Sequence, residues 1–152
     1  MSTHDVPNIY HVPLMLQEQG LCDILGVDCS ATGMLDDWKA MAFHLDTLTE
    51  EVHIAMVGKY TDLSDAYLSV IKSLQHAAMA VDRKLVIDWI EASHLEEDWA
   101  AEDHEAAWAA LRRADGILVP GGFGDRGVEG KIRAAHYART GGVPYLGICL
   151  GS

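Results

Sequence analysis

The strongest constraint in this sequence is a regular alternation, from residue 51 onward, of short apolar runs and amphipathic stretches. Apolar runs of strand-like length occur at 52–57, 85–90, 116–119 and 143–148. Patterns with helical spacing separate them, at 64–78, 104–113 and 127–139. Strands and helices that alternate through short connections are typical of a mostly parallel sheet with helices on both faces. The sequence therefore predicts an α/β fold with a partial, open, mostly parallel sheet and flanking helices.

The first third of the chain has a different character and predicts a helical segment ahead of the sheet. Residues 9–26 contain a short apolar helical face, with Pro13 suited to the first turn of a helix. Residues 26–33 have the composition of a connector. From 34 to 49, apolar residues such as Trp38 and Met41 recur at helical spacing, so we expect a second helix there.

The charge of the chain argues against a nucleic-acid partner. Its formal net charge is −12 and its pI is about 4.8, and residues 85–111 contain no lysine or arginine. A strongly anionic chain repels the phosphate backbone. The acidic stretch is interpreted as a solvated surface. No apolar run has the roughly 20 residues that a membrane-spanning helix needs, so no membrane partner is expected.

The cysteines indicate a reducing compartment. Cys22, Cys29 and Cys149 make an odd number and lack the paired spacing of a metal site, so neither a disulfide scaffold nor a metal centre is expected. Residues 1–10 do not have the basic and apolar regions of a signal peptide. We therefore expect a cytoplasmic protein.

The most informative motif is Gly147-Ile148-Cys149-Leu150-Gly151, placed directly after the last apolar run. A nucleophile between two such glycines is typical of a sharp strand-to-helix turn, which forces the nucleophile into a strained backbone conformation. A helix that began there would favour the thiolate by its positive end. The alternative is a buried cysteine whose flanking glycines only serve packing, and the motif alone does not separate the two.

A glycine-rich loop at 120–131, Pro-Gly-Gly-Phe-Gly-Asp-Arg-Gly-Val-Glu-Gly-Lys, follows the strand predicted before it. The carboxyl ends of parallel strands meet at one sheet edge, so this loop is expected beside Cys149. Its amides would then hold the oxyanion of an acyl-transfer intermediate. A phosphate-binding loop is disfavoured because Lys131 is followed by Ile132 instead of Ser or Thr. A plain connector would leave the glycines unexplained. Together the two motifs favour acyl transfer through a thioester.

These motifs resemble the CTP synthase family of class I glutamine amidotransferases. The loop at 120–130 and the Pro-Tyr-Leu-Gly-Ile-Cys-Leu-Gly run at 144–151 are similar to its glutaminase domain. The Met-Val-Gly-Lys-Tyr run at 56–60 and the Ser-Asp-Ala-Tyr run at 64–67 resemble the start of that domain, and residues 9–20 resemble the end of the synthetase domain. The resemblance implies three parts: a synthetase end at 1–26, a linker with a helix at 27–50, and half of a glutaminase domain at 51–152.

The resemblance implies a reaction and roles for particular residues. ATP would phosphorylate UTP, and ammonia from glutamine would displace the phosphate to give CTP. Cys149 would be the nucleophile, and amides near Gly122, Leu150 and Gly151 would form the oxyanion hole and bind glutamine. His4, Asp5 and Val6 match a segment that contacts the adenine of ATP. The whole enzyme would use ATP and Mg²⁺, take GTP as activator and form a homotetramer.

The chain departs from the family pattern after its nucleophile. Gly151 is followed by Ser152, where the family has Met-Gln, and the later His and Glu of the triad are not in these residues. The UTP and ATP-phosphate sites are also missing. We therefore expect no glutamine hydrolysis by this chain alone, no tightly bound cofactor, and poor stability from exposed apolar edges.

Five histidines are not expected to act as a base for Cys149. His53, His76, His94, His104 and His136 are expected on surfaces or helix faces rather than beside Cys149. Lys59 and Tyr60 follow the first strand, so they either line the site or support the core.

Two other classes of protein are alternatives to a CTP synthase. A different class I amidotransferase or a gamma-glutamyl hydrolase would have no reason to carry residues 4–20. A non-catalytic binding module with a vestigial cysteine is the remaining alternative.

Overall fold

A computed structural model describes residues 9–12, 24, 26, 33–59, 64–122 and 125–151. The chain divides into two compact units, Met1–Thr49 and Glu50–Ser152. None of the described helices is both long and apolar enough to cross a membrane. The assignment of residues 1–26 to a domain end and of 27–50 to a linker stays a prediction.

In the described part of the first unit, residues 33–47 form a regular helix. Helix α3 (Gly33–Thr47) contacts the short 3-10 turn η2 (Ile9–His11). The ring centroids of Tyr10 and Trp38 lie 5.8 Å apart, and His11 Nε2 lies 2.7 Å from a carboxylate oxygen of Asp46. The predicted helix at 34–49 is confirmed. Most of the apolar pattern predicted at 9–26 falls outside the described residues.

The second unit contains the predicted sheet. Its strands are β1 (Glu51–Gly58), β2 (Lys84–Glu91), β3 (Gly116–Val119) and β4 (Tyr145–Gly147). All neighbouring strands are parallel, in the order β2-β1-β3-β4. A parallel sheet with both faces covered needs continuous apolar strands, which explains the runs in the sequence.

Strand β4 is shorter than the run at 143–148 predicts. The N–H of Val143 donates to the carbonyl oxygen of Ala138 at 3.0 Å, which closes the preceding helix instead of joining the sheet. Pro144 has no N–H to donate. The N–H of Ile148 donates to the carbonyl oxygen of Val119 at 3.0 Å, where the chain turns away from the sheet. As the outer strand, β4 leaves Leu146 exposed, which matches the expected apolar edge.

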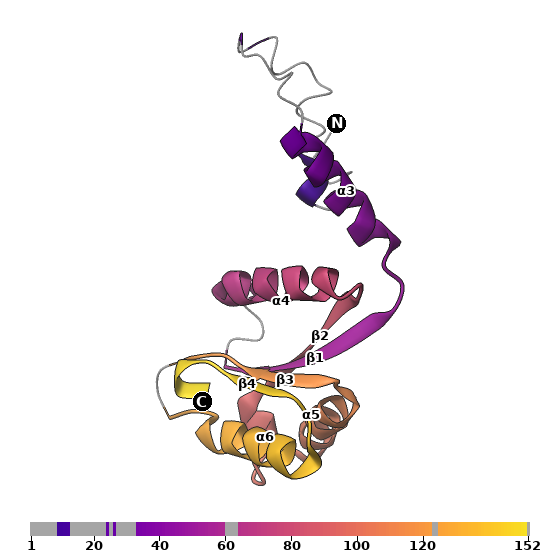
Figure 1. The fold of residues 1–152 in the computed structure, drawn as a ribbon. Helices are drawn as coiled ribbons and strands as arrows, with labels where there is room; N and C mark the ends of the chain where they lie inside the picture. The colour runs from indigo at the N-terminus through magenta and orange to yellow at the C-terminus, as the bar shows by residue number, and fades with distance from the viewer. Residues whose placement is uncertain are drawn as a thin grey trace. The chain divides into compact units, whose positions relative to one another are not determined.

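Helices cover both faces of the sheet (Figure 1). Helix α4 (Leu68–Ala80), preceded by the 3-10 turn η3 (Ser64–Tyr67), lies on one face. Helices α5 (Ala101–Arg113) and α6 (Val128–Gly141) lie on the other. Helix α4 begins four residues after the start of the predicted pattern at 64–78, and its N-cap residue, Tyr67, makes no side-chain cap bond. Helix α5 begins three residues before the predicted start, and its first turn contains Glu102 and Asp103, which suit a helix N-terminus.

The core lies between the sheet and helices α5 and α6. Strand residues such as Val57, Ile90 and Val119 pack there with Leu111 of α5 and Ala134 of α6. Another 3-10 turn, η4 (Ala92–Leu95), follows β2 and places Leu95 fully inside this core. These contacts fix the carboxyl ends of the strands against α6.

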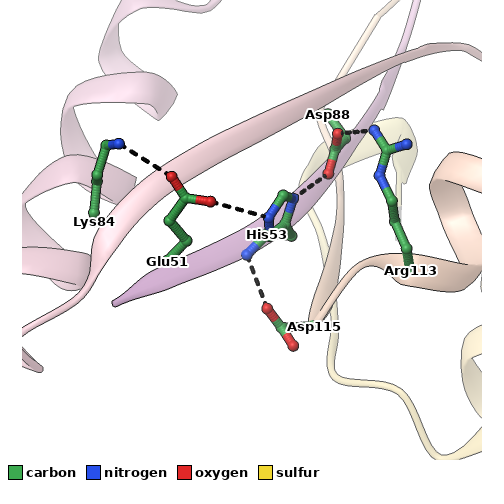
Figure 2. A network of polar contacts seen from close by, with 6 residues as sticks. All are labelled: Glu51, His53, Lys84, Asp88, Arg113 and Asp115. Carbon is green, nitrogen blue, oxygen red and sulfur yellow. Dashed lines mark hydrogen bonds and ion pairs between the residues drawn. The ribbon is translucent and has the colours of Figure 1, made fainter. Parts of the chain in front are cut away.

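A polar network occupies the amino-terminal side of the sheet (Figure 2). The buried carboxylate of Asp88 accepts hydrogen bonds from His53 Nδ1, at 2.9 Å, and from Arg113. The backbone N–H of His53 donates to a carboxylate oxygen of Asp115 at 2.9 Å, and Lys84 pairs with Glu51 at 3.0 Å. The network joins the starts of β1 and β2 to the end of α5 and the residue before β3. It lies at the strand starts, whereas Cys149 follows the end of a strand.

Candidate active site

The candidate site is the edge of the sheet at the carboxyl ends of β3 and β4. Strand β3 runs into Pro120, Gly121 and Gly122, and β4 runs through Ile148 into Cys149. Because β3 and β4 pair in parallel, with Val119 opposite Gly147, the two segments leave the sheet side by side. The expectation that the glycine-rich loop and the cysteine motif share one edge therefore agrees with the described backbone.

Cys149 has a left-handed backbone conformation. Its φ is +57°, and among the described residues Asp82 is the one other non-glycine residue with a positive φ. Such a conformation is uncommon for a residue with a side chain and persists only where its surroundings hold it. The cysteine opens the 3-10 turn η5 (Cys149–Gly151), and the residue is exposed. The sequence thus predicted a sharp turn, and the structure has one.

Gly121 packs directly against the cysteine. A Cβ atom at Gly121 would lie 3.1 Å from Cβ and 3.6 Å from Sγ of Cys149. The first of these distances is shorter than ordinary van der Waals contact, so a side chain at this position would crowd the thiol. Because Gly121 has no side chain, the backbone of the loop can lie close to the sulfur. An oxyanion hole made of backbone amides requires this close approach.

Gly151 closes the turn and is needed for packing. A Cβ atom there would lie 2.0 Å from the carbonyl oxygen of Val119, so any side chain would displace the backbone. Its N–H donates to the carbonyl oxygen of Ile148 at 3.0 Å, and its own carbonyl accepts a 2.5 Å hydrogen bond from the hydroxyl of Tyr145. The amide of Gly151 is therefore engaged within the turn, whereas the side chain of Leu150 is exposed.

Arg126 ties the glycine-rich loop to the neighbouring strands. Its Nη2 donates to the backbone oxygen of Lys59, after β1, at 2.6 Å, and lies 3.3 Å from a carboxylate oxygen of Glu91, at the end of β2. Gly127 then adopts φ +74° as the N-cap of α6. The loop is thus held to the ends of β1 and β2 where it leads into α6.

Two buried lysines border the same loop. Lys59 follows β1 and Lys131 lies in α6, and they are 5% and 6% exposed. A Cβ atom at Gly122 would lie 3.8 Å from Cδ of Lys59 and 3.9 Å from Nζ of Lys131. Burial, and then the ammonium of Lys59, hold the pKa of Lys131 below the usual lysine range, while the negative charge of Cys149 acts in the opposite direction.

Some of the predicted site residues lie beside Cys149, and others lie outside the described residues. Gly122, Leu150 and Gly151 lie on the two segments that leave the sheet beside Cys149, and their roles in catalysis stay predictions. His4, Asp5 and Val6 lie outside the described residues, as do Tyr60 and Ser152. Lys131 was missed, because the sequence reasoning used it only to exclude a phosphate-binding loop. Its place one turn into a helix that follows a glycine-rich loop was the available signal.

Several described histidines are engaged away from the thiol. His53 belongs to the network around Asp88, the ring of His94 lies 5.0 Å from that of Trp99, and His104 Nδ1 lies 2.9 Å from the carbonyl oxygen of His94. The expected helix-face position holds for His104 on α5, whereas His53 is half-buried in strand β1 and His94 is half-buried in η4. The described part of the chain also has no group of three or more His, Cys, Asp or Glu side chains that would hold a metal ion.

Residues 62–152 match the protein-family model described as "Glutamine amidotransferase class-I". The chain is 50% identical to the CTP synthase of Dictyostelium discoideum over 171 aligned residues, which cover 99% of this chain and 30% of that protein. It is 48% identical to CTP synthase 1 of Homo sapiens over 157 residues, covering 97% of this chain and 27% of that protein. The chain thus spans less than a third of the length of these relatives.

A solved structure has the same fold. The glutaminase domain of Trypanosoma brucei CTPS, with bound acivicin, superimposes with a TM-score of 0.57 and is 44% identical. The match covers 66% of this chain and 37% of the trypanosomal chain. The open parallel sheet with flanking helices is therefore the fold of a glutaminase domain of this type.

Proposed function

The chain belongs to the class I glutamine amidotransferase family, and on this premise we propose that it supplies the nucleophile and the neighbouring amide loop of the glutaminase site of a CTP synthase. The resemblance noted in the sequence is confirmed by these comparisons, as is the α/β fold. The observation that carries the proposal is the left-handed backbone of Cys149, with Gly121 packed against its side chain.

The proposed chemistry is acyl transfer through the thiol. The thiolate of Cys149 attacks the carboxamide carbon of glutamine, and the carbonyl oxygen takes the negative charge. In this proposal, backbone amides near Gly122 and Leu150 would hold the oxyanion. The carbon–nitrogen bond then breaks, the nitrogen leaves as ammonia after taking up a proton, and water hydrolyses the glutamyl thioester. The amide of Gly151 is assigned to the turn, because it already donates to Ile148.

The rest of the reaction is proposed from the relatives' name. In the whole enzyme, ATP would activate UTP and the ammonia would convert it to CTP, with Mg²⁺ at the phosphates and GTP as activator. A homotetramer, a cytoplasmic location and adenine contacts at His4, Asp5 and Val6 belong to the same proposal. They are supported by identities of 46–50% with proteins named CTP synthase.

Modification by acivicin tests the proposed site. Acivicin is an electrophilic amino acid and is bound to the trypanosomal glutaminase domain. We expect it to modify Cys149 faster than Cys22 and Cys29 of the same chain, as read by peptide mass mapping. Excess glutamine should slow the modification of Cys149 only, and Gly121→Val, which crowds the thiol, should slow it as well. Equal labelling of the three cysteines without protection by glutamine would refute a formed site.

Turnover is a separate expectation. The described histidines with assigned contacts lie away from Cys149, so no general base for repeated turnover has been located beside the thiol. We propose that the 152-residue chain by itself releases no more ammonia from glutamine than its Cys149→Ala variant. Ammonia release clearly above that control would show a working base within this chain and would overturn the expectation.

A further inference from the structure

The two buried lysines beside the glycine-rich loop have no role in the chemistry described so far. Lysine side chains are rarely buried unless a partner balances their charge. Lys59 and Lys131 come from different elements, the end of β1 and helix α6, yet they converge on the backbone of Gly122. Two ammonium groups at one place repel each other, so an arrangement of this kind favours negative charge between or beside them.

One group at this loop that can carry a negative charge is the thiol of Cys149. Gly121 borders Sγ of Cys149 and the next residue, Gly122, borders Nζ of Lys131, so sulfur and ammonium lie on either side of two consecutive glycines. The charges of Lys131 and Cys149 attract each other. Arg126 is occupied with Glu91 and the backbone of Lys59, and Tyr145 donates to Gly151. Lys131 is the described cation whose ammonium nitrogen borders Gly122, the residue next to the glycine that borders the sulfur.

We propose that Lys131 is a positioning residue of the glutaminase site, whose buried ammonium stabilises negative charge at the Gly121–Gly122 loop. The charge is first that of the Cys149 thiolate and then that of the oxyanion formed when glutamine is attacked. Lys59, whose Cδ borders the same Gly122, adds positive charge to this loop. This inference rests on the proposed function, because an oxyanion forms there only if glutamine is the substrate.

Alkylation with two reagents of similar size and different charge tests the proposal. Iodoacetate is an anion and iodoacetamide is neutral, so the ratio of their rates at one cysteine reports the local potential and cancels differences in thiol exposure. Peptide mapping of the intact chain gives this ratio for Cys149, with Cys22 and Cys29 as internal controls. In the unaltered chain we expect the highest ratio at Cys149.

Substitutions separate charge from structure. Lys131→Met should lower the ratio at Cys149 several-fold, an effect reduced by the exposure of the thiol. Lys131→Arg keeps the charge and should preserve the ratio. Lys72→Met, on α4, should leave the ratio unchanged. If Lys131→Met does not fold, as judged by circular dichroism, Lys131→Gln takes its place in the comparison.

The outcomes are distinct from those of the acivicin experiment. A reactive, folded Lys131→Met variant with the same ratio of alkylation rates at Cys149 as the unaltered chain would overturn the role of Lys131. So would a ratio at Cys149 in the unaltered chain that does not exceed those at Cys22 and Cys29. Neither result depends on glutamine, so glutamine-protected labelling by acivicin would still support the proposed function.

Discussion

Replacement of Asp88 by asparagine tests how the amino-terminal side of the sheet is held together (Figure 2). Asp88 is 8% exposed and accepts hydrogen bonds from His53 and from Arg113, which is 60% exposed. A hydrogen bond to a charged group contributes about 1.5–3 kcal/mol, and exposure of one partner reduces this to about 1 kcal/mol. Asparagine keeps one acceptor but loses the charge. We therefore expect Asp88→Asn to lower the free energy of unfolding by about 1–2 kcal/mol.

The effect should depend on pH in a defined direction. Burial alone would raise the pKa of Asp88, but the hydrogen bonds from Arg113 and His53 outweigh it and hold the pKa below the usual range. A carboxyl group with a depressed folded pKa stabilises the protein above its unfolded pKa of about 4, and this stabilisation is lost as the pH falls through the folded value. The difference between protein and variant should be full at about pH 5 and smaller at about pH 3.

Urea unfolding followed by tryptophan fluorescence measures this difference. Three of the four tryptophans, Trp89, Trp99 and Trp108, lie in the α/β unit and report its unfolding. Asp98→Asn is the matched control, because Asp98 is exposed. If Asp88→Asn were no more destabilising than this control at pH 5, or if its effect were the same at pH 3, the account of the network would be wrong.

Two further substitutions test the packing that fixes the strand ends. Gly130→Ala would place a Cβ atom 1.7 Å from the carbonyl oxygen of Ala92, so it should destabilise by about 1–3 kcal/mol or more in urea unfolding, although alanine favours helices. Gly141→Ala, with only an ordinary 3.7 Å contact, should be neutral or stabilising, and equal effects would contradict the packing argument. Leu95→Ala, at a fully buried side chain, should cost about 2–5 kcal/mol, whereas Leu68→Ala on the exposed side of α4 should stay within about 0.5 kcal/mol; a small effect at Leu95 would refute its place in the core.

Much of the fold was predictable because apolar runs record burial on both faces of a parallel sheet. The run at 52–57 became β1 and the run at 85–90 became β2, each extended by one residue at both ends. Strand β4 was overestimated because apolar content does not reveal where a backbone N–H goes. The N–H of Val143 serves the end of α6, and Pro144 has none.

The parts of the candidate site that need a particular residue type, such as glycine at a sharp turn, were predictable. Charged side chains that the fold buries were missed. Glycines on both sides of Cys149 signalled the sharp turn, and its left-handed conformation agrees. The burial of Lys131 and Asp88 was not predictable, because charged residues usually mark an exposed face. Arg113, the partner of Asp88, lies 25 residues further along the chain, so no local pattern reveals that pairing.

A crystal structure of the chain after reaction with acivicin tests the claim on which all these proposals depend, that Cys149 is a nucleophile beside the backbone of Gly121 and Gly122. The reagent should be bonded to Sγ of residue 149, with a positive φ at that residue and with the amide of Gly122 within hydrogen-bonding reach of the adduct. A well-folded chain in which that sulfur is unmodified and turned away from the backbone of Gly121 and Gly122 would contradict the assignment of a glutaminase nucleophile.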